Sequence, residues 1–323
     1  MRRLTILILL MMLLLSACGT LSPTETTTED PTEEIRELRV MTYDSFSISE
    51  EVIAQFEEEH NTQVQFLQAG DAGTMLNQAI LTRDDPQADV LYGVDNTFLS
   101  RALEAGIYEP YEAKNLDQIP DELQLDPQHR VVPTDYGDVC LNYDKSYFEE
   151  NEIAVPETLR QLTEPEYRGL LVVENPASSS PGLAFLITTI GLFGEEGDYT
   201  YLDFWADLRE NEVLVVDGWD TAYYSEFSGG AGSEGARPLV VSYATSPAAE
   251  VFFSEQDLEA PPTGAITAPS TCFRQIEFSG ILKGAENPEL AQAFIEFLLS
   301  EPFQRDIPTQ MWVFPANPEV ELP

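Results

Sequence analysis

Histidine and cysteine are rare in this chain, and their rarity excludes the commonest catalytic and metal sites. The only histidines are His60 and His129, and His60 lies in an acidic stretch that we expect at the surface. The sequence contains no HExxH, GxSxG or CxxC motif. Those motifs supply the metal ligands and nucleophiles of zinc peptidases, hydrolases and thiol oxidoreductases. We therefore expect no zinc or Ser-His catalysis, no metal site and no cofactor.

Basic residues are also scarce. The chain has 16 Lys and Arg residues against 57 Asp and Glu residues, which gives a formal charge of −41. Nucleic acids and anionic membrane surfaces bind basic side chains, so both are excluded as partners. We expect most of the acidic residues on a solvated surface. The excess is also compatible with a cationic ligand, or with a salty or acidic habitat.

A long hydrophobic run occurs only at Leu4–Leu15, and it is too short for a bilayer, which requires about 20 residues. Arg2 and Arg3 precede the run and Leu-Ser-Ala ends it, which is typical of a secretory signal peptide at 1–17. With Cys18, this end resembles the bacterial lipobox, in which the cysteine is acylated. We predict a lipoprotein anchored through Cys18 to the outer face of the cell membrane, or a periplasmic one. The alternative is an ordinary signal peptide followed by a chance cysteine.

The segment after the cysteine has the composition of a flexible linker. Thr20–Glu34 is rich in Thr, Glu and Pro and contains almost no apolar residue. Such a segment cannot bury enough apolar surface to fold, so 18–36 is predicted to be a disordered tether. The body from residue 37 onward is too long for one small core and suits two lobes.

Two cysteines remain if Cys18 carries lipid. An exported protein meets an oxidising environment, where an even pair of cysteines favours a disulfide. We therefore predict a bond between Cys140 and Cys272. Two buried thiols are the alternative.

The folded body alternates apolar strand patterns with helix patterns, and the alternation restarts after Pro133. This order is typical of mainly parallel sheets with flanking helices, so the predicted fold class is α/β. The expected strands are 38–43, 62–67, 88–94, 137–143, 170–174, 212–216 and 239–243. The expected helices begin near Ser49, Thr74, Asp95, Pro181, Tyr201 and Asn287.

Ligands of such folds bind in a crevice at the carboxyl ends of the strands. Aromatic and acidic candidates lie at the predicted loop ends, namely Tyr43, Asp71, Trp219, Tyr243 and Trp312. Aromatic faces beside a carboxylate suit a flat cationic ligand, through stacking and cation–π attraction of about 0.5–2 kcal/mol each. Taken singly, each aromatic side chain could instead pack in a core, and Asp71 could cap a helix.

Three serines, Ser178, Ser179 and Ser180, precede a predicted helix. Hydroxyl groups and free backbone N–H groups at a helix start can bind an anion. The lysine of a Walker loop is missing after them, which argues against a nucleotide site. An N-cap in a polar loop is the alternative.

The chain resembles the thiamine-binding proteins of ABC importers, within the periplasmic iron/thiamine/polyamine-binding superfamily. The more specific matches are Tyr43-Asp44-Ser45-Phe46 and Ser242-Tyr243-Ala244-Thr245-Ser246-Pro247. Looser matches are Ala88-Asp89-Val90, Val94-Asp95-Asn96, Asp135-Tyr136-Gly137, Ser180-Pro181-Gly182, Gly218-Trp219 and Ile307-Pro308-Thr309 with Trp312.

The resemblance implies a two-lobed periplasmic-binding-protein fold of type II, with the ligand in the interlobe cleft. Lobe 1 would comprise 37–133 plus 248–303, and lobe 2 would comprise 134–247 plus 304–323. The implied protein is a monomer that is not an enzyme. It would capture thiamine, or thiamine phosphates, for the permease of an ABC importer.

The resemblance also implies residue roles. Tyr43, Trp219, Tyr243 and Trp312 would surround the thiamine rings. Asp71 would bind the aminopyrimidine, and the turn 178–180 would meet the hydroxyethyl or phosphate end. The chain lacks the tryptophan that the family often has near Ser47–Glu50, and it has Ala249 where some members have tyrosine, so the aromatic cage is expected to be smaller or differently lined.

Other functions stay open at this point. Ferric iron is bound in related proteins by an adjacent tyrosine pair, and Tyr223-Tyr224 is such a pair. Acids and aromatics together could also bind a polyamine. An extracytoplasmic hydrolase is the alternative from a different class, and the missing catalytic motifs argue against it.

Overall fold

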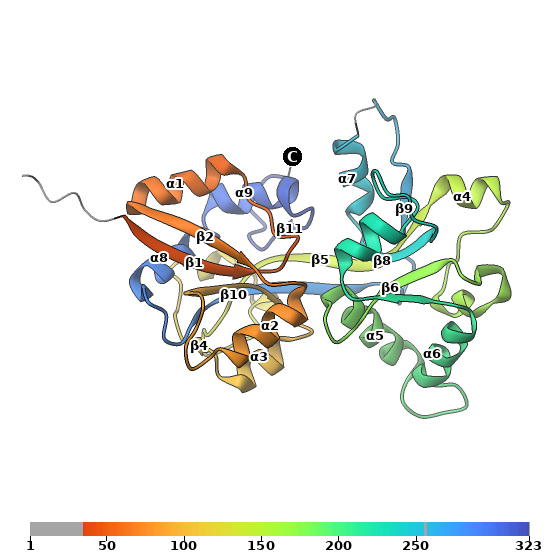
Figure 1. Ribbon diagram of the computed structural model, residues 1–323, viewed down its shortest axis with the longest axis horizontal. Coiled ribbons are helices and arrows are strands. Elements are labelled where there is room, and N and C mark those ends of the chain that lie inside the picture. The colour runs from red at the N-terminus through yellow and green to blue at the C-terminus, as the bar shows by residue number, and fades with distance from the viewer. Residues whose placement is uncertain (1–34, 255–256, 323) are drawn as a thin grey trace, which may run out of the picture. The chain divides into compact units, whose positions relative to one another are not determined.

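The computed structural model describes residues 35–254 and 257–322 (Figure 1). The predicted signal peptide at 1–17, the lipidation site Cys18 and nearly all of the tether lie outside these ranges. Arg36, expected at the end of the tether, is instead the first residue of a strand. In the described part of the chain, no helix combines the length and the hydropathy that crossing a bilayer requires.

The described strands form one mixed sheet of eleven strands. They are β1 (Arg36–Thr42), β2 (Thr62–Gln68), β3 (Val90–Asp95), β4 (Tyr108–Glu109), β5 (Val132–Asp144), β6 (Leu171–Glu174), β7 (Leu214–Val216), β8 (Leu239–Tyr243), β9 (Thr263–Ile266), β10 (Phe273–Leu282) and β11 (Phe314–Pro315). The order is β2-β1-β3-β10-β5-β8-β6-β7, with β4 beside β10 and with β9 and β11 beside β5. Strands β1–β3 pair in parallel, as do β6–β8, which confirms the predicted α/β class.

Helices flank this sheet, and most begin close to their predicted starts. They are α1 (Glu50–His60), α2 (Ala72–Leu81), α3 (Leu99–Ala105), α4 (Lys145–Glu150), α5 (Ser180–Phe193), α6 (Tyr201–Glu210), α7 (Ser246–Phe252), α8 (Pro288–Leu298) and α9 (Glu301–Gln310). The Asp71 carboxylate accepts the Ala72 N–H at the start of α2. Ser49 precedes α1, but its side chain makes no capping hydrogen bond. Asp95 ends a strand rather than starting a helix.

Strand β10 is the main element that the sequence did not predict. It lies antiparallel between β3 and β5, so it joins the two parallel parts of the sheet. Its first half contains Arg274, Gln275 and Glu277, which interrupt the apolar pattern that identified the other strands. In Figure 1, β5 and β10 run side by side from one parallel part of the sheet to the other.

The buried apolar side chains form one large core on β1, β3 and β10 and smaller cores on the strands from β5 to β8. The ring of Tyr243, at the end of β8, packs against both of the two largest cores. The packing differs from the expected division at two segments. Ile307 and Val313 belong to the core of β1 and β10, although 304–323 was expected with lobe 2. Ile266 belongs to the core of β5 and β8, although 248–303 was expected with lobe 1.

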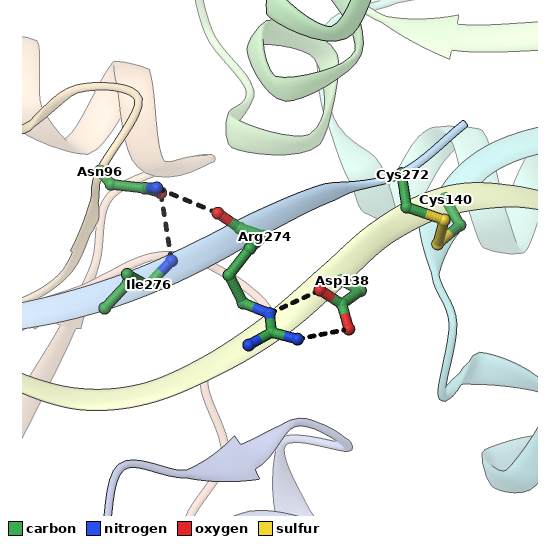
Figure 2. A network of polar contacts seen from close by, with 6 residues as sticks. All are labelled: Asn96, Asp138, Cys140, Cys272, Arg274 and Ile276. Atoms are coloured by element: carbon green, nitrogen blue, oxygen red, sulfur yellow. Dashed lines mark hydrogen bonds and ion pairs between the residues drawn. A yellow bond between two sulfur atoms is a disulfide. The ribbon is translucent and has the colours of Figure 1, made fainter. Parts of the chain in front are cut away.

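Side chains and a disulfide link β5 to β10 (Figure 2). Cys140 in β5 and Cys272, just before β10, form a disulfide with their Cα atoms 4.4 Å apart. The Arg274 guanidinium donates to both carboxylate oxygens of Asp138, over 2.6 and 3.1 Å. Asn96 adds two bonds to the backbone of β10, accepting the Ile276 N–H and donating to the Arg274 carbonyl. The disulfide closes a loop with a sequence separation of 132 residues.

The disulfide is expected to stabilise the fold. Removing it with Cys140→Ala/Cys272→Ala should lower the free energy of unfolding by about 3–5 kcal/mol, because the unfolded chain regains the conformational freedom of a long loop. Urea titration monitored by circular dichroism measures this change. Dithiothreitol should lower the wild-type value and leave the variant unchanged. Equal stabilities of the two proteins without reductant would contradict the prediction.

Candidate functional site

A cavity of about 970 Å³, measured together with its opening to solvent, lies between side chains of the large core on β1, β3 and β10 and side chains of the small core that contains Tyr223. It is lined by six of the predicted site residues, which are Tyr43, Asp71, Ser180, Trp219, Tyr243 and Trp312. Seven further lining residues that the sequence analysis did not assign to a thiamine site are Tyr223, Tyr224, Glu250, Phe253, Gln275, Glu277 and Met311. We call this space the main cavity.

Two of the predicted site residues do not line the main cavity. The Ser178 hydroxyl donates to the Asp217 carbonyl over 2.6 Å, and the Ser178 N–H donates to the Asn175 carbonyl. Ser179 is completely buried. Helix α5 begins only at Ser180, and the preceding turn folds back on Asn175, so neither serine lines the main cavity.

One wall of the main cavity consists of stacked aromatic rings. The Trp219 ring lies on the Tyr223 ring, with centroids 5.0 Å apart and planes at 19°. Tyr224 meets Trp219 edge to face at 5.4 Å, and Tyr243 approaches it at 6.5 Å. The Trp219 indole N–H donates to the Ser242 hydroxyl over 2.9 Å, which fixes the orientation of the ring. These contacts hold the rings of the wall in place, which lowers the entropic cost of binding a ligand.

Tyr43 lies on the other side, at the end of β1, and its position depends on a glycine. Its hydroxyl donates to Glu277 over 2.9 Å. Gly93 in β3 has φ +93°, and a Cβ atom there would lie 2.2 Å from a carbon of the Tyr43 ring. Only glycine leaves room for this ring.

Trp312 comes from the segment after α9 and contacts α7. Its ring packs against Phe252 and Phe253, with centroids 5.1 and 5.5 Å apart. The Thr245 hydroxyl donates to the Trp312 carbonyl. The indole nitrogen of Trp312 is buried without a hydrogen-bond partner. An unpaired indole N–H is costly to bury, which makes it available to an acceptor on a ligand.

Three carboxyl groups line the main cavity. Burial raises the pKa of Glu277 well above its usual range, and the charges of Asp135 and Asp95 raise it further. Burial also raises the pKa of Asp71, although the N–H groups of Ala72 and Trp219 oppose the shift. The pKa of Glu250 is raised by burial and lowered in part by the hydroxyl of Tyr223.

No basic side chain compensates these carboxyl groups. Among the described residues that line the main cavity there is no Lys, Arg or His. A buried carboxylate without a cationic partner is unstable, so each of these groups would gain from a positively charged ligand. The cavity therefore combines aromatic faces with carboxyl groups that lack a basic partner, and an organic cation would favour the ionised forms of these groups.

The chain offers little for a metal ion. In residues 35–254 and 257–322, no group of three or more His, Cys, Asp or Glu side chains is arranged to hold one. The tyrosine pair 223–224 does line the main cavity. Burial raises the pKa of Tyr223, as do the charge of Glu250 and the hydrogen bond to it, which disfavours the phenolate that a ferric ion requires.

Glu277 is the lining residue that sequence reasoning most clearly missed. It lies in β10, between Ile276 and Phe278, and it is 6% exposed. Gln275 donates to Glu277 over 2.7 Å, and Tyr243 donates to Gln275 over 3.0 Å. An acidic residue between two apolar ones inside a strand-like segment was the available signal. A solvated surface strand is the commoner origin of that pattern.

Glu277 should make the stability of the ligand-free protein depend on pH. The folded protein holds protons on Glu277, and on Asp135 with its pKa of about 6, at pH values where the unfolded chain has lost them. This contribution to stability is full below the unfolded pKa of about 4 and is lost as pH rises through about 6 and above.

Glu277→Gln keeps the side chain neutral at every pH. Relative to wild type, we expect this variant to gain about 1 kcal/mol or more in the free energy of unfolding between pH 5 and pH 7.5, since one pKa unit corresponds to about 1.4 kcal/mol. Urea titrations at the two pH values measure the gain. The exposed Glu289→Gln is the control and should show none. If the free energy of unfolding changed equally with pH in wild type and in Glu277→Gln, Glu277 would not be the source of the pH dependence.

Known proteins are similar in sequence to this chain over most of its length. Residues 85–323 match the family "Bacterial extracellular solute-binding protein". The thiamine-binding periplasmic protein of Escherichia coli (strain K12) is 30% identical over 291 residues, which are 88% of this chain and 82% of the relative. Iron uptake protein A1 of Synechocystis sp. is 26% identical over 314 residues, which are 96% and 83% of the two chains.

Solved structures share the fold. A periplasmic thiamin binding protein superposes with a TM-score of 0.76 at 27% identity, covering 90% of this chain and 86% of that one. Iron-bound HitA from Pseudomonas aeruginosa, at 17% identity, superposes with a TM-score of 0.70 over 89% of each chain. The predicted periplasmic-binding-protein fold and the resemblance to the thiamine-binding group are confirmed. The chain belongs to the family of bacterial extracellular solute-binding proteins.

Proposed function

We propose that this protein captures thiamine outside the cytoplasmic membrane and delivers it to the permease of an ABC importer. The observation that carries the proposal is the main cavity, in which aromatic faces and three carboxyl groups, two of them buried, occur without a basic side chain among the described lining residues. Thiamine has two flat rings, a thiazolium with a permanent positive charge and an aminopyrimidine. Each of these features has a counterpart among the lining residues.

The thiazolium ring would lie against the aromatic wall. A cation over an aromatic face gains about 0.5–2 kcal/mol, and most where water is excluded. Tyr43, Trp219, Tyr243 and Trp312 would surround the two rings. Asp71 would accept a hydrogen bond from the aminopyrimidine, and a bound cation would favour the ionised form of Glu277 next to Tyr43.

The relatives support the same ligand and the same cellular location. Thiamine-binding periplasmic proteins from Escherichia coli and from Brucella suis biovar 1 are each 30% identical to this chain. By this proposal the chain acts outside the cytoplasm as a monomer without enzymatic activity, and Cys18 would hold it to the membrane through lipid.

Ferric iron is the second candidate, and one observation favours it. The hydroxyl of Tyr223 lies 2.7 Å from Glu250 at the main cavity, and a phenol beside a carboxyl group could bind iron. Two observations oppose it: the pKa of Tyr223 is raised, and its ring is covered by Trp219. Polyamines would satisfy the carboxyl groups but would leave the stacked rings without a flat partner.

Trp219→Ala should weaken thiamine binding at least tenfold, about 1.4 kcal/mol, because the variant loses the stacking face and opens the wall. Titration calorimetry measures the affinity, with ferric citrate titrated in parallel. We expect one thiamine per chain, quenched tryptophan fluorescence and no heat with iron.

The third tryptophan provides the matched control. Trp205 lies in α6, away from the main cavity, and donates to Thr189. Trp205→Phe should keep both the affinity and most of the quenching, whereas Trp219→Phe should lose the part of the quenching that comes from Trp219 and keep the part that comes from Trp312. If only ferric citrate gave heat of binding, together with a tyrosinate–iron colour, the ligand of the protein would be ferric iron and not thiamine. Unchanged affinity in Trp219→Ala would place the ligand elsewhere.

A further inference from the structure

A second cavity opens beside the main cavity and is lined mostly by polar groups. The two cavities share Ser45, Asp71 and Trp219, so they adjoin each other. The second has a volume of about 610 Å³ with its opening to solvent, and four aspartates line it: Asp44, Asp71, Asp217 and Asp220. We call it the aspartate cavity.

Negative charge is concentrated in the aspartate cavity. Partial burial of its carboxyl group raises the pKa of Asp220, and the charges of Asp71 and Asp44 raise it further, so these carboxylates repel one another. Among the described residues that line either cavity, none is Lys, Arg or His. The Arg274 guanidinium, on β10, is held by Asp138 instead (Figure 2).

The three serine hydroxyls near the start of α5 are not available to an anion in either cavity. The Ser180 hydroxyl donates to the Asp95 carboxylate, and the Ser178 hydroxyl donates to the Asp217 carbonyl. The Ser179 hydroxyl has no hydrogen-bond partner among the described residues, but it is completely buried and lines neither cavity. The one of these serines that lines the main cavity is therefore bonded to a carboxylate.

We propose that the site is selective for an organic cation with an uncharged tail, and that it rejects the same cation when the tail carries phosphate. This inference rests on the proposed function and names the form of the ligand that the site accepts. A hydroxyethyl tail can bond to the hydroxyls of Ser45, Thr74 and Thr221, which also line the aspartate cavity. A phosphate or diphosphate tail would face carboxylates at short range without a counter-charge.

The test compares thiamine, thiamine monophosphate and thiamine diphosphate by titration calorimetry on the purified full-length protein at low ionic strength. We expect the monophosphate to bind at least tenfold more weakly than thiamine, and the diphosphate more weakly still, because each phosphate adds repulsion. Added salt should narrow the difference, since the Debye length falls to about 10 Å at 0.1 M.

Charge-removing variants assign the selectivity to the aspartate cavity. The Asp217 and Asp220 residues are exposed, so Asp217→Asn/Asp220→Asn should fold normally and should reduce the preference for thiamine over the monophosphate at least threefold. Glu149→Gln/Glu150→Gln removes the same charge from exposed positions on α4 and should leave the preference unchanged.

The outcomes separate the two proposals. Equal affinities of wild type for all three compounds would overturn the selectivity and leave thiamine capture in place. A preference that falls equally in both double variants would also overturn it, since the effect would come from total charge. Absence of thiamine binding would overturn the proposed function itself.

Discussion

The antiparallel pairing of β5 with β10 is the constraint on which the rest of the structure depends. Each strand contributes to both parts of the sheet, and the pairing brings segments more than a hundred residues apart into register. The same pairing sets Glu277 opposite Asp135 and places Gln275 within reach of Tyr243. The register of the sheet, and not a flexible loop, thus places Glu277 and Gln275 in the lining of the main cavity.

The buried Glu277 favours ligand binding and lowers the stability of the ligand-free fold. Hydrogen bonds from Tyr43 and Gln275 hold Glu277 in place, yet burial keeps its pKa raised, so these bonds do not offset desolvation. A fold optimised for stability alone would replace this group by an apolar side chain or pair it with a base. Conflict between local stability and the surroundings of a side chain is typical of functional sites.

Sequence patterns were sufficient for the strands that alternate with helices, because their apolar residues lie in short uninterrupted runs such as 38–43 and 239–243. They failed for β10, whose polar residues serve an ion pair and the main cavity: Arg274 binds Asp138, and Glu277 faces Tyr43. Of the four aromatic residues predicted for the site, Tyr43, Trp219 and Tyr243 lie at or just after the ends of β1, β7 and β8 and line the main cavity, as expected where strand ends meet at one edge of a sheet.

The serine turn could not be placed from the sequence, because its direction is set by bonds to Asn175 and Asp217 that involve backbone atoms. The assignment of the C-terminal segments to one lobe or the other likewise depends on the core in which Ile307 and Val313 pack. The spacing of apolar residues alone does not show in which of two cores a helix packs. The disulfide between Cys140 and Cys272 has a mechanical consequence. A covalent bond between adjacent strands forbids one strand from sliding along the other. Any movement of one core relative to the other must therefore bend or twist β5 and β10 together, as a single two-stranded ribbon.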